Sequence, residues 1–165
     1  MQPTTPGHPV SAAMAAELAR FLDRGPMHEV ATRDERLMPE VVVGQGAWIS
    51  TSGETLSVLI PEPLAARTLA NARAHREVAA VFVNPINEQS VQIKGTYLSH
   101  GPADAGALAA RDRWRVGATE QLELVGLPRS HGNRMGHGPA LVLHIRIRDV
   151  YEATPGPRAG KPLAG

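Results

Sequence analysis

Cysteine is absent from this chain of 165 residues, so disulfide bonds, thiolate metal ligands and a cysteine nucleophile are all excluded. Aromatic residues are scarce, with two Trp, two Tyr and two Phe, so the stacking platforms that bind single-stranded nucleic acids are not expected. No stretch approaches the roughly 18 apolar residues that a membrane span requires. A formal net charge of +1 gives no general attraction to polyanions. We therefore expect neither a nucleic-acid partner nor a membrane.

The length of the chain predicts a single domain. Residues 1–10 are rich in proline and are predicted to be disordered. They lack the basic and apolar regions of a signal peptide, so a cytoplasmic location is expected. Residues 11–153 are predicted to form the folded domain, followed by an extended or disordered tail over the Pro/Gly-rich residues 154–165.

Strand patterns outnumber helix patterns along the domain. Apolar residues recurring from Met14 to Leu22 predict an amphipathic helix that Ser11 caps. Further helices are expected from about residue 63, from 101 to about 116, with Asp104 as its candidate cap and Gly117 as an interruption, and from 119 to 125, before a long loop over 126–139. Alternating or continuous apolar residues predict six strands, over 27–33, 39–50, 55–60, 78–83, 90–98 and 141–148. These elements indicate an α+β protein, mainly β, whose six antiparallel strands form a closed or nearly closed barrel.

Arg67, Thr68 and Asn71 lie near the predicted start of the helix that precedes residue 78. A helix N-terminus offers free N–H groups and a partial positive charge to an anion. Arg67 can add a bidentate guanidinium and Thr68 a hydroxyl donor. The three residues therefore suit a phosphate, and the alternative is a solvated helix face that carries one arginine.

Ser90, Gln92 and Lys94 share one face of the strand predicted over 90–98. An outward polar face is the ordinary explanation of this alternation, and it is preferred for Ser90. Lys94 is one of only two lysines in the chain, and its ammonium could contact a phosphate. The histidines lack spacing of the HExxH type and no cysteine supports them, so no metal site is expected.

Residues 64–97 resemble the FMN-binding split-barrel family related to pyridoxamine 5'-phosphate oxidase. The resemblance lies in a helix with a basic residue and an asparagine, an apolar strand, and a later strand that ends in a basic residue and glycine. In this chain these features are Arg67-Thr68, Asn71, Arg76-Glu77-Val78 and Lys94-Gly95. The ending at residues 150–160 also looks like the TPGPxAG tail of uncharacterised family members.

The chain departs from the family pattern at several positions. Thr68 stands where a lysine is frequent, and no proline precedes Arg76. True pyridoxamine 5'-phosphate oxidases end with a Trp and an Arg-Leu-x-Pro segment, whereas this chain ends KPLAG and has no Trp after Trp114. The resemblance is therefore to an uncharacterised member and not to a true oxidase of this kind.

The resemblance implies that FMN is the cofactor. Its phosphate would be held at Arg67, Thr68 and Asn71, and its ring would lie beside the strand that carries Ser90, Gln92 and Lys94. A lysine there would stabilise the reduced, anionic ring. Gly44 and Gly46 would let the flat ring lie against the main chain.

The resemblance also implies a homodimer, because family members place two flavin sites at an interface to which both chains contribute. The implied function is an FMN-binding protein that acts as an FMN-dependent oxidoreductase on an unidentified small molecule. The alternatives are a non-catalytic flavin-binding or flavin-sensing protein, and a split barrel that binds haem or the deazaflavin F420.

Overall fold

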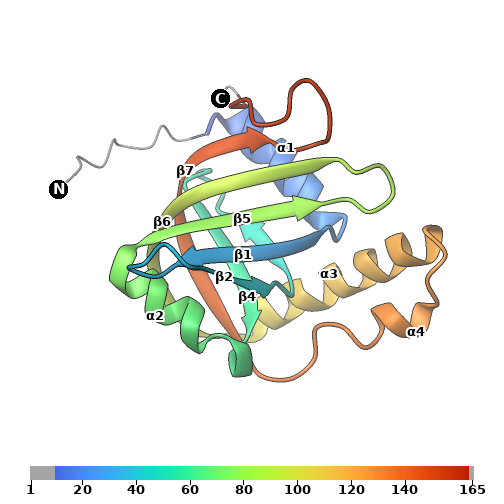
Figure 1. The fold of residues 1–165 in the computed structure, drawn as a ribbon. Coiled ribbons are helices and arrows are strands. Elements are labelled where there is room, and N and C mark those ends of the chain that lie inside the picture. Colours follow the sequence, from blue (N-terminus) through green and yellow to red (C-terminus); the bar gives the residue numbers. More distant parts are fainter. Residues whose placement is uncertain (1–9, 164–165) are drawn as a thin grey trace.

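The computed structural model describes residues 10–163, so most of the predicted disordered N-terminus lies outside the described residues. These residues form one antiparallel sheet in the order β2-β1-β5-β6-β7-β4-β3, with helices packed against it. The strands are β1 Met27–Arg33, β2 Pro39–Val43, β3 Ala47–Ile49, β4 Thr55–Pro61, β5 Glu77–Val83, β6 Ser90–Pro102 and β7 Ala140–Glu152. Figure 1 shows β6, β5, β1 and β2 across the front of the molecule, with β4 crossing steeply behind them. The predicted α+β class with an antiparallel sheet is confirmed.

The predicted count of six strands is wrong, because the strand expected over 39–50 is two strands separated by a kink. β2 pairs with β1, whereas β3 pairs with β4 at the other end of the sheet. Between them, Gly44 N–H donates to the carbonyl of His28 at 2.9 Å, and Leu59 N–H donates to the carbonyl of Gly46 at 2.9 Å. The kink therefore links the two ends of the sheet. β2 and β3 remain its two edges, and no ladder between them closes a barrel within residues 10–163.

The helices are α1 Ala12–Asp23, α2 Ala66–His75, α3 Ala105–Leu124 and the short α4 Arg129–Gly132, with a 3-10 turn over Glu62–Leu64 before α2. The predicted caps are confirmed: Ser11 accepts from Met14 N–H at 3.2 Å, and Asp104 accepts from Ala107 N–H at 2.8 Å. Both acceptors satisfy donors that the first helical turn leaves free. α4 lies in the region predicted as a loop.

Gly117 does not interrupt α3, contrary to the prediction. A Cβ atom at residue 117 would lie 2.6 Å from the carbonyl oxygen of Arg24, so glycine permits close contact between α3 and the end of α1. Glycine costs a helix about 1 kcal/mol relative to alanine. Packing against Arg24 at the end of α1 offsets that cost, and α3 continues through Gly117.

The core lies on the inner face of the curved sheet, beneath α1 and α2. Each fully buried aliphatic or aromatic side chain contributes about 1.5–3 kcal/mol. A smaller cluster on the other side of β4 and β7 lies under α3 and includes Leu59, Ala107 and Val142, with Trp48 partly buried against it. The main cluster includes Leu18, Phe21, Val30, Leu69, Phe82, Ile93 and Ile145.

The residues after β7 fold back onto the sheet, although an extended or disordered tail was predicted for residues 154–165. Glu152 N–H donates to the carbonyl of Lys161 at 2.9 Å, and Leu163 N–H donates to that of Val150 at 2.8 Å. The proline and glycine residues here form turns that return the chain to β7. No helix within residues 10–163 is long and apolar enough to cross a membrane.

Candidate binding site on the outer face of the sheet

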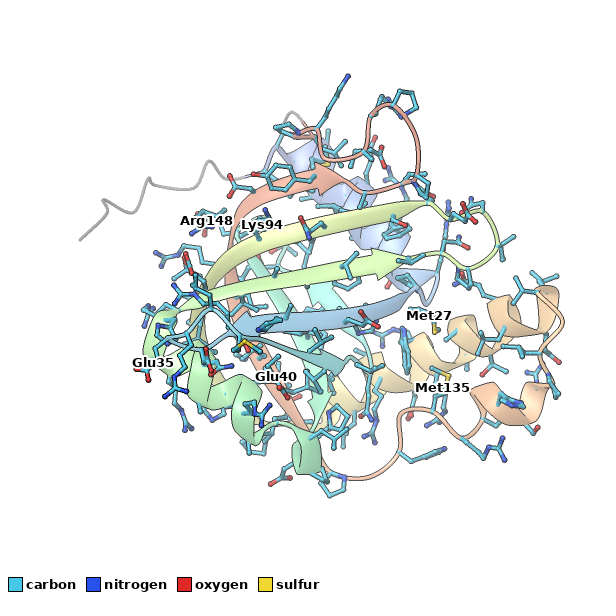
Figure 2. All side chains as sticks on the ribbon, in the orientation of Figure 1. Met27, Glu35, Glu40, Lys94, Met135 and Arg148 are labelled. Atoms are coloured by element: carbon cyan, nitrogen blue, oxygen red, sulfur yellow. The ribbon has the colours of Figure 1, made fainter. Side chains whose placement is uncertain are left out.

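Arg67 lies in the first turn of α2, close to where the sequence predicts a phosphate site. Its Nη1 atom is 3.0 Å from Oε2 of Glu40 in β2. The arginine side chain is 76% exposed, and Figure 2 labels Glu40 beside α2. The guanidinium is thus free to move, but a carboxylate already neutralises it. An anion that binds to Arg67 therefore competes with Glu40 for the guanidinium.

Thr68 and Asn71 face the sheet and not the solvent. Thr68 is fully buried, and its hydroxyl oxygen has no hydrogen-bond partner among the described residues. Asn71 is also buried, and its Nδ2 donates to Oγ1 of Thr32 in β1 at 3.3 Å. The predicted trio is therefore not gathered around one exposed point. Arg67 lies outside, and its two neighbours lie beneath the helix.

The polar residues of β6 serve different purposes. Ser90 is buried, and its hydroxyl donates to the carbonyl of Glu88 at 2.7 Å, while Thr154 accepts from its backbone N–H at 2.9 Å. Ser90 therefore holds the loop before β6 against the tail. Gln92 and Lys94 are half-buried on the outer face. The Lys94 ammonium lies 4.8 Å from the centre of the Tyr151 ring, within the range of a cation–π contact.

A β-bulge beside Lys94 explains why Gly95 follows it. Lys94 pairs with Asp149, but Gly95 pairs with Ile147, so Arg148 is an extra residue in β7. A Cβ atom at residue 95 would overlap the backbone carbonyl of Arg146. Glycine therefore lets β6 and β7 approach at this point, and a bulge re-aims the side chain of its extra residue.

The bulge opens onto a cleft of about 340 Å³ that crosses β1, β5, β6 and β7. Figure 2 shows Lys94 and Arg148 labelled next to each other at one end of the sheet. Ala31 and Ala79 are cross-strand neighbours, and Ala79 also pairs with Lys94, so small side chains form a flat floor beside the ammonium. The cleft is lined by Ala31, Thr32, Arg33, Glu77, Val78, Ala79, Lys94 and Arg148.

Charges in the cleft are unbalanced, with three cations and one carboxylate among its lining residues. Arg33 donates from Nε and Nη2 to the same oxygen of Glu77, at 3.1 and 2.7 Å, so this pair is neutral. Arg148 uses only Nε, which lies 3.3 Å from Oδ2 of Asp149. Lys94 has no hydrogen bond or ion pair with another described residue. Lys94 is therefore the cation without a carboxylate partner among the described residues, and Arg148 keeps its two terminal nitrogens free of hydrogen bonds within residues 10–163.

His28 is a buried polar residue whose role the sequence did not indicate. Its Nδ1 lies 3.1 Å from the carbonyl oxygen of Pro26, and Gly46 N–H lies 3.1 Å from its Nε2. A backbone N–H can only donate, so Nε2 accepts and Nδ1 carries the proton. The ring stacks on Phe82, with centroids 5.2 Å apart. Burial lowers the pKa of His28 to about 4, which keeps it neutral near pH 7.

The His28 ring occupies the space that Gly44 leaves open. A Cβ atom at residue 44 would overlap the imidazole, and Gly46 has a φ of 129°, which favours glycine. The flat group that Gly44 accommodates is therefore a histidine side chain of the same chain, to which Gly46 donates its backbone N–H. A sequence signal existed, because His28 shares the buried face of β1 with Val30 and Thr32.

The remaining polar groups of the described residues do not form a metal site. No cluster of three or more His, Asp or Glu side chains suited to a metal ion occurs within residues 10–163. His100 has a lowered pKa, caused first by burial and then by the charge of Arg73, whose Nη2 is 2.9 Å from the ring. A second cleft, of about 480 Å³, is lined by the loop before β6 and the tail, but its Arg158 is paired with Glu152. The cleft beside Lys94 is the stronger candidate for a ligand, because its ammonium has no carboxylate partner among the described residues.

Comparison with known proteins identifies solved structures that share the fold. No protein-family model and no curated protein matches the sequence. HupZ of Group A Streptococcus is 16% identical, with a TM-score of 0.52 over 88% of this chain and 98% of that chain. An F420 reductase is 17% identical, with a TM-score of 0.53 over 79% of this chain and 93% of that one. A putative pyridoxamine 5'-phosphate oxidase from Lactobacillus delbrueckii is 18% identical, with a TM-score of 0.50 over 82% and 91%. At these identities the likeness establishes a shared fold.

Proposed function

We propose that this chain, whose fold is that of the pyridoxamine 5'-phosphate oxidase-like split barrels, is a flavin-binding protein with FMN as its cofactor. The observation that carries the proposal is the cleft on the outer face of the sheet. Its floor of Ala31 and Ala79 is flat enough for a ring system, and Lys94 stands beside it without a carboxylate partner among the described residues. The proteins with this fold include an F420 reductase, which agrees with a flavin-like ligand.

The donors present suit a flavin in part. Lys94 and Gln92 point outward from β6 and can reach a ring above the alanines. Arg67 is the proposed partner of the flavin phosphate, once Glu40 has moved away. Thr68 offers a hydroxyl without a hydrogen-bond partner in residues 10–163. It is a weaker candidate than Arg67 because it is buried beneath the helix. Asn71 supports the site through Thr32, which lines the cleft.

The proposed activity is that of an FMN-dependent oxidoreductase on a small molecule. Bound FMN would supply hydride or electron transfer. The protein would bind and orient the ring and adjust its electrostatics. Lys94 would favour the anionic reduced state over the neutral oxidised state, because a nearby cation stabilises the more negative form.

A homodimer is proposed because the outer face of the sheet continues from the cleft into an exposed apolar surface. Val41 and Val43 point outward from the edge strand β2 and are 53% and 54% exposed, and Leu37 and Met38 in the preceding turn are more exposed still. A stable interface buries roughly 800 Å² on each partner. A second copy on this surface would supply a wall for the cleft and would cover an open sheet edge.

The first test is the identity of any small molecule that co-purifies with the full chain. The protein is expected to be yellow, and mass spectrometry of the released ligand should give the mass of FMN. A colourless protein that takes up no FMN when it is supplied would refute the proposal. A co-purifying mass of a deazaflavin would favour the second candidate function, F420 binding, which agrees with the fold shared with an F420 reductase.

A further inference from the structure

We propose that Lys94 and Arg148 together form an oxyanion-binding site in the outer cleft, for a phosphate monoester or carboxylate group of a small ligand. This site would recognise an anionic group in the same cleft that is proposed to bind the flavin. The identity of the ligand therefore rests on the proposed function. Arg148 was not expected from the sequence to take part, since it is one of several arginines on the polar face of its strand.

The bulge in β7 places the two cations at one end of the same cleft. Arg148 is the residue without a partner in β6, and Gly95 allows the strands to approach where it is inserted. In a regular ladder Arg148 would be paired, and its side chain would alternate to the opposite face from its neighbour Asp149. Both Lys94 and Arg148 line the cleft, so the bulge directs the Arg148 side chain into the cleft that also holds the Lys94 ammonium.

Lys94 and Arg148 line the same cleft, and the described residues compensate their charges only in part. The only carboxylate among the lining residues, Glu77, accepts both contacts from Arg33. Asp149 contacts Nε of Arg148, which leaves the two terminal nitrogens without a hydrogen bond in residues 10–163. Those nitrogens are the donors that bind an oxyanion in a forked geometry. An anion that contacts both the ammonium and the guanidinium would supply the negative charge that Lys94 lacks among the described residues.

The start of α2 presents a single cation to an oxyanion, whereas the bulge presents two. There the single exposed cation, Arg67, already has the carboxylate of Glu40 at 3.0 Å, and Thr68 is buried under the helix. At the bulge, two cations share one cleft with a flat floor. An incoming oxyanion therefore meets one carboxylate-paired arginine at the first place. At the second it meets a carboxylate-paired arginine together with a lysine that has no carboxylate partner among the described residues.

The oxyanion could come from the phosphate of the flavin or from an anionic substrate. Titration of the isotope-labelled full chain with inorganic phosphate, at constant ionic strength, tests the site without a flavin. Amide chemical shifts of Ala79, Lys94 and Arg148 should move with a common dissociation constant. Arg148→Gln and Lys94→Met should each weaken phosphate binding about tenfold, which corresponds to the loss of one charged hydrogen bond. Arg146→Gln is the matched control, because Arg146 is an exposed arginine on the same strand outside the cleft lining.

Two further arms identify the source of the anion. If Arg148→Gln removes a preference for FMN over riboflavin, the group is the flavin phosphate. If that preference survives while inorganic phosphate no longer binds, the group belongs to the substrate. Phosphate binding with no flavin binding would refute the flavin function and leave the site standing. Equal phosphate affinity in wild type, Arg148→Gln and Arg146→Gln, or shifts confined to the start of α2, would overturn the proposal.

Discussion

Replacement of His28 by glutamine should flatten the dependence of stability on pH between neutral and mildly acidic solution. Folding buries the imidazole and lowers its pKa from 6.5 to about 4. The unfolded chain therefore binds a proton below pH 6.5 that the folded chain excludes. The free energy of unfolding must then fall as the pH falls from 6.5 towards 4. The contribution of His28 to that free energy is fully present above pH 6.5.

The magnitude follows from the two pKa values. Their difference corresponds to about 3.4 kcal/mol over the whole window, and to about 2 kcal/mol between about pH 7.5 and pH 5. Urea unfolding of a domain of this size has a slope of about 2 kcal/mol per molar, so the midpoint should fall by roughly 1 M between these pH values. A single-domain stability of about 5–15 kcal/mol makes such a loss easy to measure.

The assay compares urea midpoints of the wild type and His28→Gln at both pH values. The variant should be less stable at pH 7.5, because it loses the stacking on Phe82, but its midpoint should fall much less on acidification. His100, which also has a lowered pKa, is present in both proteins, so the difference isolates His28. His131→Gln, at an exposed position in α4, should show the same change of urea midpoint with pH as the wild type. Equal pH dependence in the wild type and His28→Gln would refute the neutral, buried imidazole.

Three further predictions concern the proposed ligand and dimer. Arg67→Gln should weaken FMN binding about tenfold to hundredfold in calorimetry and leave riboflavin binding unchanged, whereas Glu40→Gln should strengthen FMN binding. Equal FMN affinity in the wild type and both variants would place the phosphate elsewhere. Lys94→Met should lower the reduction potential of bound flavin in a potentiometric titration, because the reduced anion loses its cation, and an unchanged potential would place Lys94 away from the ring. Val41→Lys should convert a dimer into a monomer in light scattering, while Leu124→Lys, an equally drastic change at an exposed position of α3, should not; loss of the dimer in both variants or in neither would contradict the proposed interface.

Local signals in the sequence predicted most of the elements. The caps at Ser11 and Asp104 and the alternation in β6 and β7 follow from rules that involve only a few neighbouring residues. These rules gave the α+β class and the antiparallel sheet. They failed where distant segments meet, as at Gly117, where contact with Arg24 keeps the helix intact.

The candidate site was predicted less completely, because its geometry depends on pairing between strands. Lys94 and Gly95 could be identified from the sequence, but the bulge that makes the glycine necessary lies in the register of β6 against β7. Arg148 could not be distinguished from its neighbours without that register. Thr68 could have been assigned to the buried face, because it follows Ala65 and precedes Ala72 at helical spacing.

The glycines of the kinked strand show the same limit. Gly44 and Gly46 were predicted to let a flavin ring lie against the main chain, whereas the flat group found against Gly44 is the His28 imidazole. His28 lies 16 and 18 residues before them, and only the pairing of β1 with β2 brings its ring there.

The central claim is that this chain binds a flavin in the cleft beside Lys94. Titration of FMN fluorescence with the full chain tests it most directly, with Lys94→Met as the variant and Lys161→Met, at the other lysine of the chain, as the control. We predict saturable quenching with one FMN per chain, unchanged in Lys161→Met and weakened in Lys94→Met. Absence of saturable quenching by the wild type would contradict flavin binding, and identical titrations of all three proteins would contradict its assignment to this cleft.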